Sequence, residues 1–164
     1  MALIEGWFDG VCEPVNPGGH AAWGALLKLD GKVVHAWGNY CGYGPDMSNN
    51  FAEYSGVLAL LRELRMRQER GLSGPIMIRG DSQLVIMQLR RKWKVHGGLY
   101  VPVYQQAVEA LAVVSKQAGS KVKLIWIPRE ENGECDVLSK NELHRRGVRF
   151  RLQPEAPPRE EARA

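Results

Sequence analysis

Residues 2–41 set the architecture of this protein, and their sequence is ALIEGWFDGVCEPVNPGGHAAWGALLKLDGKVVHAWGNYC. Three runs within it, 2–12, 20–29 and 32–41, are apolar and rich in aromatic residues, a composition typical of β-strands. NPGG separates the first run from the second, and Asp30-Gly31 between the second and third favours a tight hairpin. The stretch therefore predicts three consecutive antiparallel strands.

After residue 41 the pattern changes to strands that alternate with helices. Apolar residues recur at helical spacing, and the segment IMIRG runs into a helix with no room for a long loop. The predicted elements are a helix over 50–69, a strand over 76–80, a helix from Asp81 to about Lys92, a helix near 100–118, a strand over 122–127 and a helix from about Asn132 to Arg146. The predicted order is βββαβααβα.

This order is typical of an α/β fold with one mixed sheet. Three antiparallel strands are followed by two parallel strands, and helices flank the five-stranded sheet. We expect one catalytic domain over residues 1–152. The tail over 153–164 is rich in Pro, Glu and Arg without apolar periodicity, so we expect it to be disordered.

The composition is that of an ordinary globular protein, with 45% apolar and 24% charged residues. No apolar run approaches the ~20 residues that span a bilayer, and the N-terminus lacks the features of a signal peptide, so we expect a cytoplasmic protein without a membrane partner. The cysteines, Cys12, Cys41 and Cys135, are scattered and lack CxxC spacing, which favours neither a disulfide framework nor a zinc site.

The net charge of +4 would help a phosphate backbone to approach, but it is weak support for nucleic-acid binding by itself. The basic residues cluster over 62–70, 90–94 and 145–151. Solvated helix faces are the simpler interpretation of the first and last clusters.

Four acidic residues lie where an α/β fold places its functional groups. Asp9 lies in the first predicted strand and Asp81 at the end of the fourth, while Glu53 and Asp136 lie in the first turns of helices. Active sites in such folds form beyond strand ends and at helix N-termini, so the four carboxylates can converge.

Each of these residues also has a purely structural interpretation. Asp9-Gly10 could form a turn, Asn50-x-x-Glu53 resembles a capping box, Asp81 could cap its helix, and Asp136 could favour the positive end of its helix. Such roles are common for single acidic residues, and only the joint context of all four favours a functional site.

That context consists of FDGVCEPVNPGG around Asp9, SNNFAEY around Glu53, RGDSQLV around Asp81 and IPREENGECDVLS around Asp136. In this order and on these elements, the motifs resemble type I ribonuclease H over about residues 2–146. The resemblance implies the ribonuclease H-like fold. It also implies endonucleolytic hydrolysis of the RNA strand of RNA/DNA hybrids, which leaves 5′-phosphate and 3′-hydroxyl ends.

Clustered carboxylates need cations. At ~5 Å separation and an effective dielectric near 20, each pair repels by roughly 3 kcal/mol, and oxygen ligands select Mg²⁺ or Mn²⁺. The resemblance implies two ions, with Asp9 bridging both, Asp136 completing the site of the water-activating ion, and Glu53 and Asp81 holding the other. Many family members place a histidine before the last aspartate; this chain has none over 128–132, and the resemblance suggests Asn132, Glu130 or Glu131 as a partial substitute in product release.

The resemblance also implies contacts with the hybrid. The positions that match the family's 2′-hydroxyl contacts are Cys12, Asn16, Asn49, Asn50 and Gln83, while Ser48 matches a DNA-phosphate contact and Trp93 and Lys94 match residues along the DNA strand. Alternatives stay open: Asn16 as a turn residue, Asn49 and Asn50 as helix caps, Gln83 as a solvated helix residue and Trp93 as a core aromatic.

Two other functions fit the same features less well. A nuclease or integrase that acts on DNA could share the fold, because fold alone does not fix the substrate. A catalytically silent hybrid-binding module is disfavoured, since four carboxylates at the contact surface would repel a polyanion. We expect a monomeric enzyme whose partner is an RNA/DNA hybrid.

Overall fold

A single five-stranded sheet organises the computed structural model, which describes residues 1–151. The strands are β1 (Ile4–Glu13), β2 (His20–Leu29), β3 (Lys32–Tyr43), β4 (Ile76–Gly80) and β5 (Lys123–Trp126), arranged in the order β3-β2-β1-β4-β5. The first three strands are antiparallel, and β4 and β5 add to β1 in parallel. The predicted mixed sheet is confirmed, whereas the expected tail over 153–164 lies outside the described residues.

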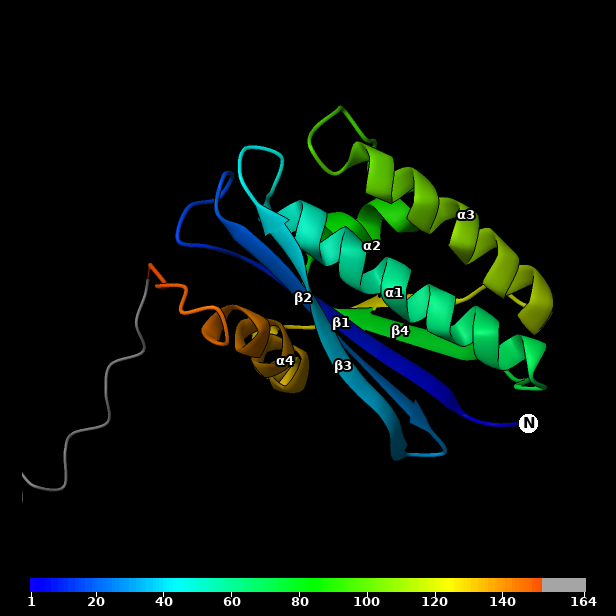
Figure 1. The fold of residues 1–164 in the computed structure, drawn as a ribbon. Helices are drawn as coiled ribbons and strands as arrows, with labels where there is room; N and C mark the ends of the chain where they lie inside the picture. The colour runs from blue at the N-terminus through cyan, green and yellow to red at the C-terminus, as the bar shows by residue number, and fades with distance from the viewer. Residues whose placement is uncertain (152–164) are drawn as a thin grey trace, which may run out of the picture.

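Helices cover both faces of this sheet (Figure 1). Their bounds are α1 (Asn49–Glu69), α2 (Gln83–Leu89), α3 (Val101–Ala118) and α4 (Gly133–His144). The helices α1, α2 and α3 lie on one face, and α4 lies on the other, where it packs on β1, β2 and β3. The predicted order βββαβααβα is confirmed, with one addition: the loop before α4 contains a short 3₁₀ helix, η1 (Arg129–Glu131).

Two of the helix ends that differ from the prediction have a clear local reason, and α2 also begins at Gln83 where Asp81 was expected. α1 begins at Asn49 because Ser48 is its N-cap, whose Oγ accepts a hydrogen bond from the Phe51 amide at 3.0 Å. α2 ends at Leu89, short of the expected Lys92, because Arg91 adopts a left-handed conformation with φ of 59°. An arginine in the sequence does not predict such a helix end, since glycine is the usual residue at this position.

The main core fills the space between the sheet and the three helices on one face. Its fully buried side chains alternate along the strands and follow one face of α1, as the apolar periodicity predicts; they include Ile4, Phe8, Tyr54, Leu61, Leu64 and Ile78. This packing fixes α1 against β1, the strand that contributes Asp9.

Two glycines allow the helices to approach the sheet closely on opposite faces. A Cβ on Gly10 would lie 2.3 Å from the Glu53 amide nitrogen, so only glycine lets the start of α1 rest against β1. A Cβ on Gly24 would lie 2.6 Å from the Cys135 carbonyl oxygen, so glycine at this position lets α4 pack closely on β2. The two contacts bring Glu53 and Asp136 to opposite sides of Asp9's strand.

Candidate active site

Three carboxylates converge at one point near the middle of the sheet. Oxygen atoms of Asp9, Glu53 and Asp81 all lie within 4.8 Å of one another. Asp9 lies in the centre of β1, Glu53 near the start of α1, and Asp81 directly after β4. Three segments that are distant in the sequence therefore supply one compact acidic group.

Strand register explains why two of these residues are neighbours. β1 and β4 run parallel, and Phe8 pairs with Gly80. Asp9 directly follows Phe8 and Asp81 directly follows Gly80, so both carboxylates emerge at the same level. The close approach of α1 at Gly10 then adds Glu53 from above the sheet.

Burial makes this group electrostatically costly without a cation. Asp9 is 5% exposed and Glu53 is 2% exposed. Burial raises the pKa of Asp9 to about 7, and burial together with the Asp9 charge raises the pKa of Glu53 well above its usual value. Burial also raises the pKa of Asp81. One oxygen of Glu53, Oε2, is buried without a hydrogen-bond partner among the described residues.

The structural alternatives for these three residues are wrong. Asp9 lies in a regular strand, where it pairs with Gly24, and so does not form a turn. Glu53 lies just after the first turn of α1, whereas it was predicted within that turn. Ser48 caps this helix, so Asn50 and Glu53 do not form a capping box. Ser82 caps α2 by accepting a hydrogen bond from the Val85 amide, so Asp81 is not the cap.

Asp136 lines the same pocket, which has a volume of about 540 Å³, but does not belong to the compact group. Its carboxylate forms a salt bridge with Lys140 at 2.9 Å, and its side chain is 30% exposed. Its charge adds to the forces that raise the pKa of Asp9 and of Asp81. It does lie in the first turn of α4, as predicted, so the interpretation as a residue at the positive helix end stays compatible with the structure.

Asn132 connects the acidic group to the sheet. Its Nδ2 donates hydrogen bonds to the Phe8 carbonyl oxygen at 2.8 Å and to Asp81 Oδ2 at 3.0 Å. The residue is 2% exposed, and its Oδ1 has no hydrogen-bond partner within residues 1–151. Asn132 therefore holds Asp81 in place, whereas its predicted part in product release stays a prediction.

The loop between β1 and β2 reaches the start of α1 through two of the predicted substrate contacts. Asn16 Oδ1 accepts a hydrogen bond from the Asn49 amide at 2.8 Å, and Asn49 lines the carboxylate pocket. Cys12 also lines this pocket, but its thiol is buried and donates to the Val15 carbonyl oxygen at 3.2 Å. Asn50, the next residue, is half-buried. Gln83, the first residue of α2, is exposed.

The basic segment over 90–94 divides between two surfaces. Arg90 and Arg91 line a groove beside β5, whereas Lys92, Trp93 and Lys94 line a separate hollow with Tyr100. Trp93 is 42% exposed, so the alternative of a core aromatic is wrong. Its contact with DNA stays a prediction, as does that of Lys94.

The residues that line the carboxylate pocket and that sequence reasoning missed include Arg129, Lys140, Phe150 and Arg151. The spacing between Asp136 and Lys140 could have indicated a salt bridge on one helix face. Nothing local indicates Arg151, which donates to Glu13 Oε2 at 3.1 Å and to the Cys12 carbonyl oxygen at 2.9 Å across 138 and 139 residues. Part of the last basic cluster thus lies at the site and is not a solvated helix face.

A model of the family described as reverse transcriptase-like matches residues 8–142. The chain belongs to this family. It resembles ribonuclease HI of Halobacterium salinarum, with 29% identity over 140 residues, which are 85% of this chain and 64% of that protein. The chain thus spans less than two thirds of the length of this curated relative.

Solved structures of ribonucleases H share the fold. The crystal structure of RNase H1 from the same archaeon has a TM-score of 0.71 at 29% identity and covers 87% of this chain and 98% of its own. The N-terminal RNase H domain from Mycobacterium tuberculosis has a TM-score of 0.72 at 25% identity, and the match covers 90% of this chain and 97% of that chain. LC11-RNase H1 in complex with an RNA/DNA hybrid has a TM-score of 0.74 at 23% identity, and the match covers 87% of this chain and 98% of that chain. At this identity the likeness supports the fold alone. The predicted resemblance to type I ribonuclease H is confirmed.

Across residues 1–151, the helices are all too short or too polar to cross a lipid bilayer.

Proposed function

We propose that this family member is a ribonuclease H, a metal-dependent endonuclease that hydrolyses the RNA strand of RNA/DNA hybrids and leaves 5′-phosphate and 3′-hydroxyl ends. The observation that carries this proposal is the group of three buried carboxylates whose oxygens lie within 4.8 Å. The similarity to ribonuclease HI supports the substrate class. Its action as a cytoplasmic monomer stays a prediction.

The acidic group fits divalent cations. All its ligand atoms are carboxylate oxygens, which suit Mg²⁺ and Mn²⁺. The buried Glu53 Oε2 has no other partner in the described chain, and mutual repulsion of the carboxylates needs positive charge between them. Glu53 and Asp81 would hold one ion together with Asp9, and Asp136 would hold a second ion together with Asp9. Bound ions would supply the charge that acidifies an attacking water and stabilises a phosphate leaving oxygen.

The protein's own residues would position the substrate around this charge. Asn132 keeps the Asp81 carboxylate directed at the group through its hydrogen bond. Lys140 forms a salt bridge with Asp136 at 2.9 Å, and Arg129 adds positive charge to the same pocket. The hydrogen bond between Asn16 and Asn49 fixes the loop that would face the 2′-hydroxyls of the RNA strand.

One gel assay tests the proposal directly. Labelled RNA/DNA hybrid, double-stranded RNA and double-stranded DNA are each incubated with the protein, with Mg²⁺ and with EDTA. We expect cleavage of the hybrid's RNA strand only, and only with the metal. Cleavage in EDTA would refute the metal mechanism. Equal cleavage of double-stranded DNA would favour a DNA-directed nuclease on the same fold, and binding without cleavage would favour a silent module.

A further inference from the structure

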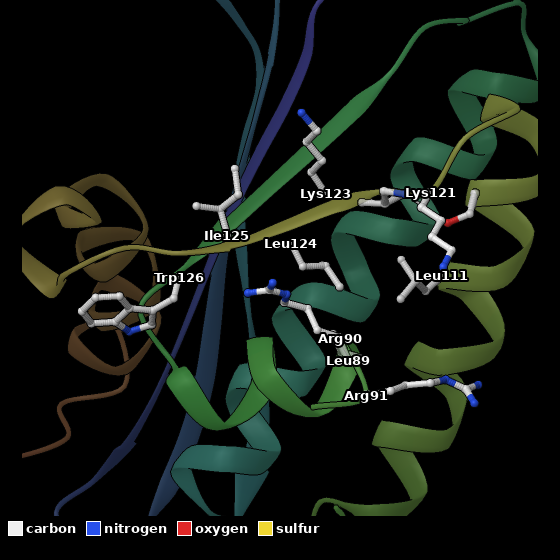
Figure 2. A pocket seen from close by; sticks show the side chains of 11 residues that line it. Leu89, Arg90, Arg91, Leu111, Lys121, Lys123, Leu124, Ile125 and Trp126 are labelled. Atoms are coloured by element: carbon white, nitrogen blue, oxygen red, sulfur yellow. Dashed lines mark hydrogen bonds between the residues drawn. The ribbon is translucent and has the colours of Figure 1, made fainter. Parts of the chain in front are cut away.

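A basic groove of about 760 Å³ runs along the edge strand β5, outside the carboxylate pocket (Figure 2). Its walls come from the end of α2, the second half of α3 and β5 itself. Four cationic residues line it, namely Arg90, Arg91, Lys121 and Lys123, and the lining contains no acidic residue. Within residues 1–151, none of these four cations forms a salt bridge. The groove therefore presents uncompensated positive charge above an apolar floor that includes Leu124.

Trp126 joins this groove to the candidate active site. Its ring is 48% exposed, and its Nε1 donates a hydrogen bond to the Asp81 carbonyl oxygen at 3.1 Å. Figure 2 shows Trp126 at one end of β5 and Lys121 at the other, with Arg90 between them. The segment 121–126 spans roughly 17 Å at about 3.3 Å per residue. A chain that leaves the carboxylates past Trp126 and follows this edge would thus have cations on either side of it, because the Lys123 side chain points to the opposite side of β5 from Arg90 (Figure 2).

The backbone of Arg91 gives an independent reason to look here. The Lys92 amide donates to the Met87 carbonyl oxygen and the Arg91 amide donates to the Gln88 carbonyl oxygen, both at 2.9 Å. This pair of bonds is the Schellman arrangement, in which the left-handed residue is usually glycine. Here it is Arg91, with φ of 59°. An arginine in this conformation is less favourable than glycine, which indicates a use for its side chain in the groove.

We propose that the β5 groove binds a single-stranded polynucleotide segment that extends beyond the hybrid at the active site. Sequence-tolerant binding of single strands combines a positively charged groove with an exposed aromatic ring on which a base stacks, and this groove has both. Trp126 supplies the ring, and the four cations, of which Lys123 lies on the other side of β5 from Arg90, contact phosphates along this edge. The inference rests on the proposed function in taking a nucleic acid as the substrate. An acidic peptide shares the negative charge but has no base to stack on Trp126.

Equilibrium binding tests the groove without any cleavage. Fluorescence anisotropy with a labelled oligothymidylate compares the wild type with the double variant Lys121→Ala/Lys123→Ala. Each lost phosphate contact should lower the slope of log K against log salt by about 0.7, so the double variant should lose roughly 1.4 units of slope and bind on the order of tenfold more weakly near 0.1 M salt. Lys32→Ala is the matched control, because Lys32 is exposed on β3, the opposite edge strand.

Cleavage kinetics test whether the groove serves the active site. A hybrid with a single-stranded extension is compared with the same hybrid ending flush. We expect the extension to lower KM with kcat unchanged, and the Lys121→Ala/Lys123→Ala protein to lose this gain while cutting the flush hybrid as the wild type does. If no hybrid is cut by any protein, the proposed function fails, yet the oligothymidylate result still decides the groove.

Arg91→Gly separates binding from folding. The change removes a cation and places glycine at the left-handed position, so Tm should stay equal or rise while affinity for oligothymidylate falls. Three results would overturn the proposal: equal affinity of the wild type and both groove variants, an equal loss in Lys32→Ala, or tighter binding of a polyglutamate peptide than of oligothymidylate. The last result would identify the groove as a site for an acidic protein segment.

Discussion

The negative charges of the residues in the acidic group repel one another until a cation binds between them. Asp9 and Glu53 are both buried, and the charge of Asp9 helps to raise the pKa of Glu53. A group arranged in this way lowers the stability of the metal-free fold and favours ion binding. Single substitutions can therefore separate a functional carboxylate from a structural one.

The substitution Asp81→Asn should abolish hydrolysis while leaving the metal-free protein as stable as the wild type or more stable. The amide removes one negative charge from the group, and its oxygen can still accept the hydrogen bond from Asn132. Thermal unfolding with and without Mg²⁺ provides the measurement, and Mg²⁺ should raise Tm less in the variant. A marked fall of Tm without metal would instead assign Asp81 a structural role.

Asn132→Ala should lower both stability and activity, because it leaves the buried Phe8 carbonyl oxygen without its side-chain donor and releases the Asp81 carboxylate. The expected loss is roughly 1 to 3 kcal/mol in the free energy of unfolding. Asn141→Ala is the control, since Asn141 is an exposed asparagine on α4. Denaturant unfolding and Mg²⁺ titration measure the two effects, and equal Mg²⁺ affinity in Asn132→Ala and the wild type would contradict the positioning role.

Whole elements meet at the site only because two glycines let them approach. Gly10 admits α1 to β1, and Gly24 admits α4 to β2. The relevant distances are backbone distances, so a flexible neighbour cannot make room. The site geometry thus depends on helix placement as much as on the acidic residues themselves.

Gly10→Ala should destabilise the fold by about 1 to 3 kcal/mol or more and weaken Mg²⁺ binding, because the added Cβ must push the start of α1, and Glu53 with it, away from Asp9. Gly133→Ala is the control at the start of α4, where a Cβ would meet nothing within 4 Å and alanine favours the helix. Tm and isothermal titration with Mg²⁺ measure both proteins. Unchanged Mg²⁺ affinity in Gly10→Ala would show that α1 does not hold Glu53 in this way.

At the scale of elements the sequence predicted most of what the structure shows. Hydrophobic periodicity and the Asp30-Gly31 turn predicted the strands and helices because those signals are local. The end of α2 escaped prediction because Arg91 takes a conformation that its side chain does not favour. The position of Arg151 escaped it because its contact with Glu13 spans 138 residues and leaves no periodic trace in the chain.

The whole molecule should respond to pH through its acidic group. The folded-state pKa of Asp9 is raised from 3.8 to about 7, so the folded protein keeps a proton that the unfolded chain has already lost between these values. Stability of the metal-free protein from this source is greatest below about pH 4, falls as pH rises towards 7 and then levels off. Asp9→Asn should remove this part of the pH dependence.

Thermal unfolding of the wild type and Asp9→Asn from pH 4 to pH 8 isolates the effect as a difference between two curves. Mg²⁺ should raise the wild-type Tm more at pH 8 than at pH 5, because at the lower pH the ion competes with the proton on Asp9. Parallel curves for the two proteins would contradict the raised pKa.

The hydrogen bond from Asn132 to the Phe8 carbonyl oxygen also bears on the order in which the protein assembles. It joins positions 124 residues apart, and such high contact order delays a contact until most of the chain is organised. During synthesis, β1 and α1 leave the ribosome long before η1 and α4. A nascent chain therefore carries Asp9 and Glu53 without the groups that complete their surroundings, and we expect the acidic group to be completed late, at the step that docks α4 on the sheet.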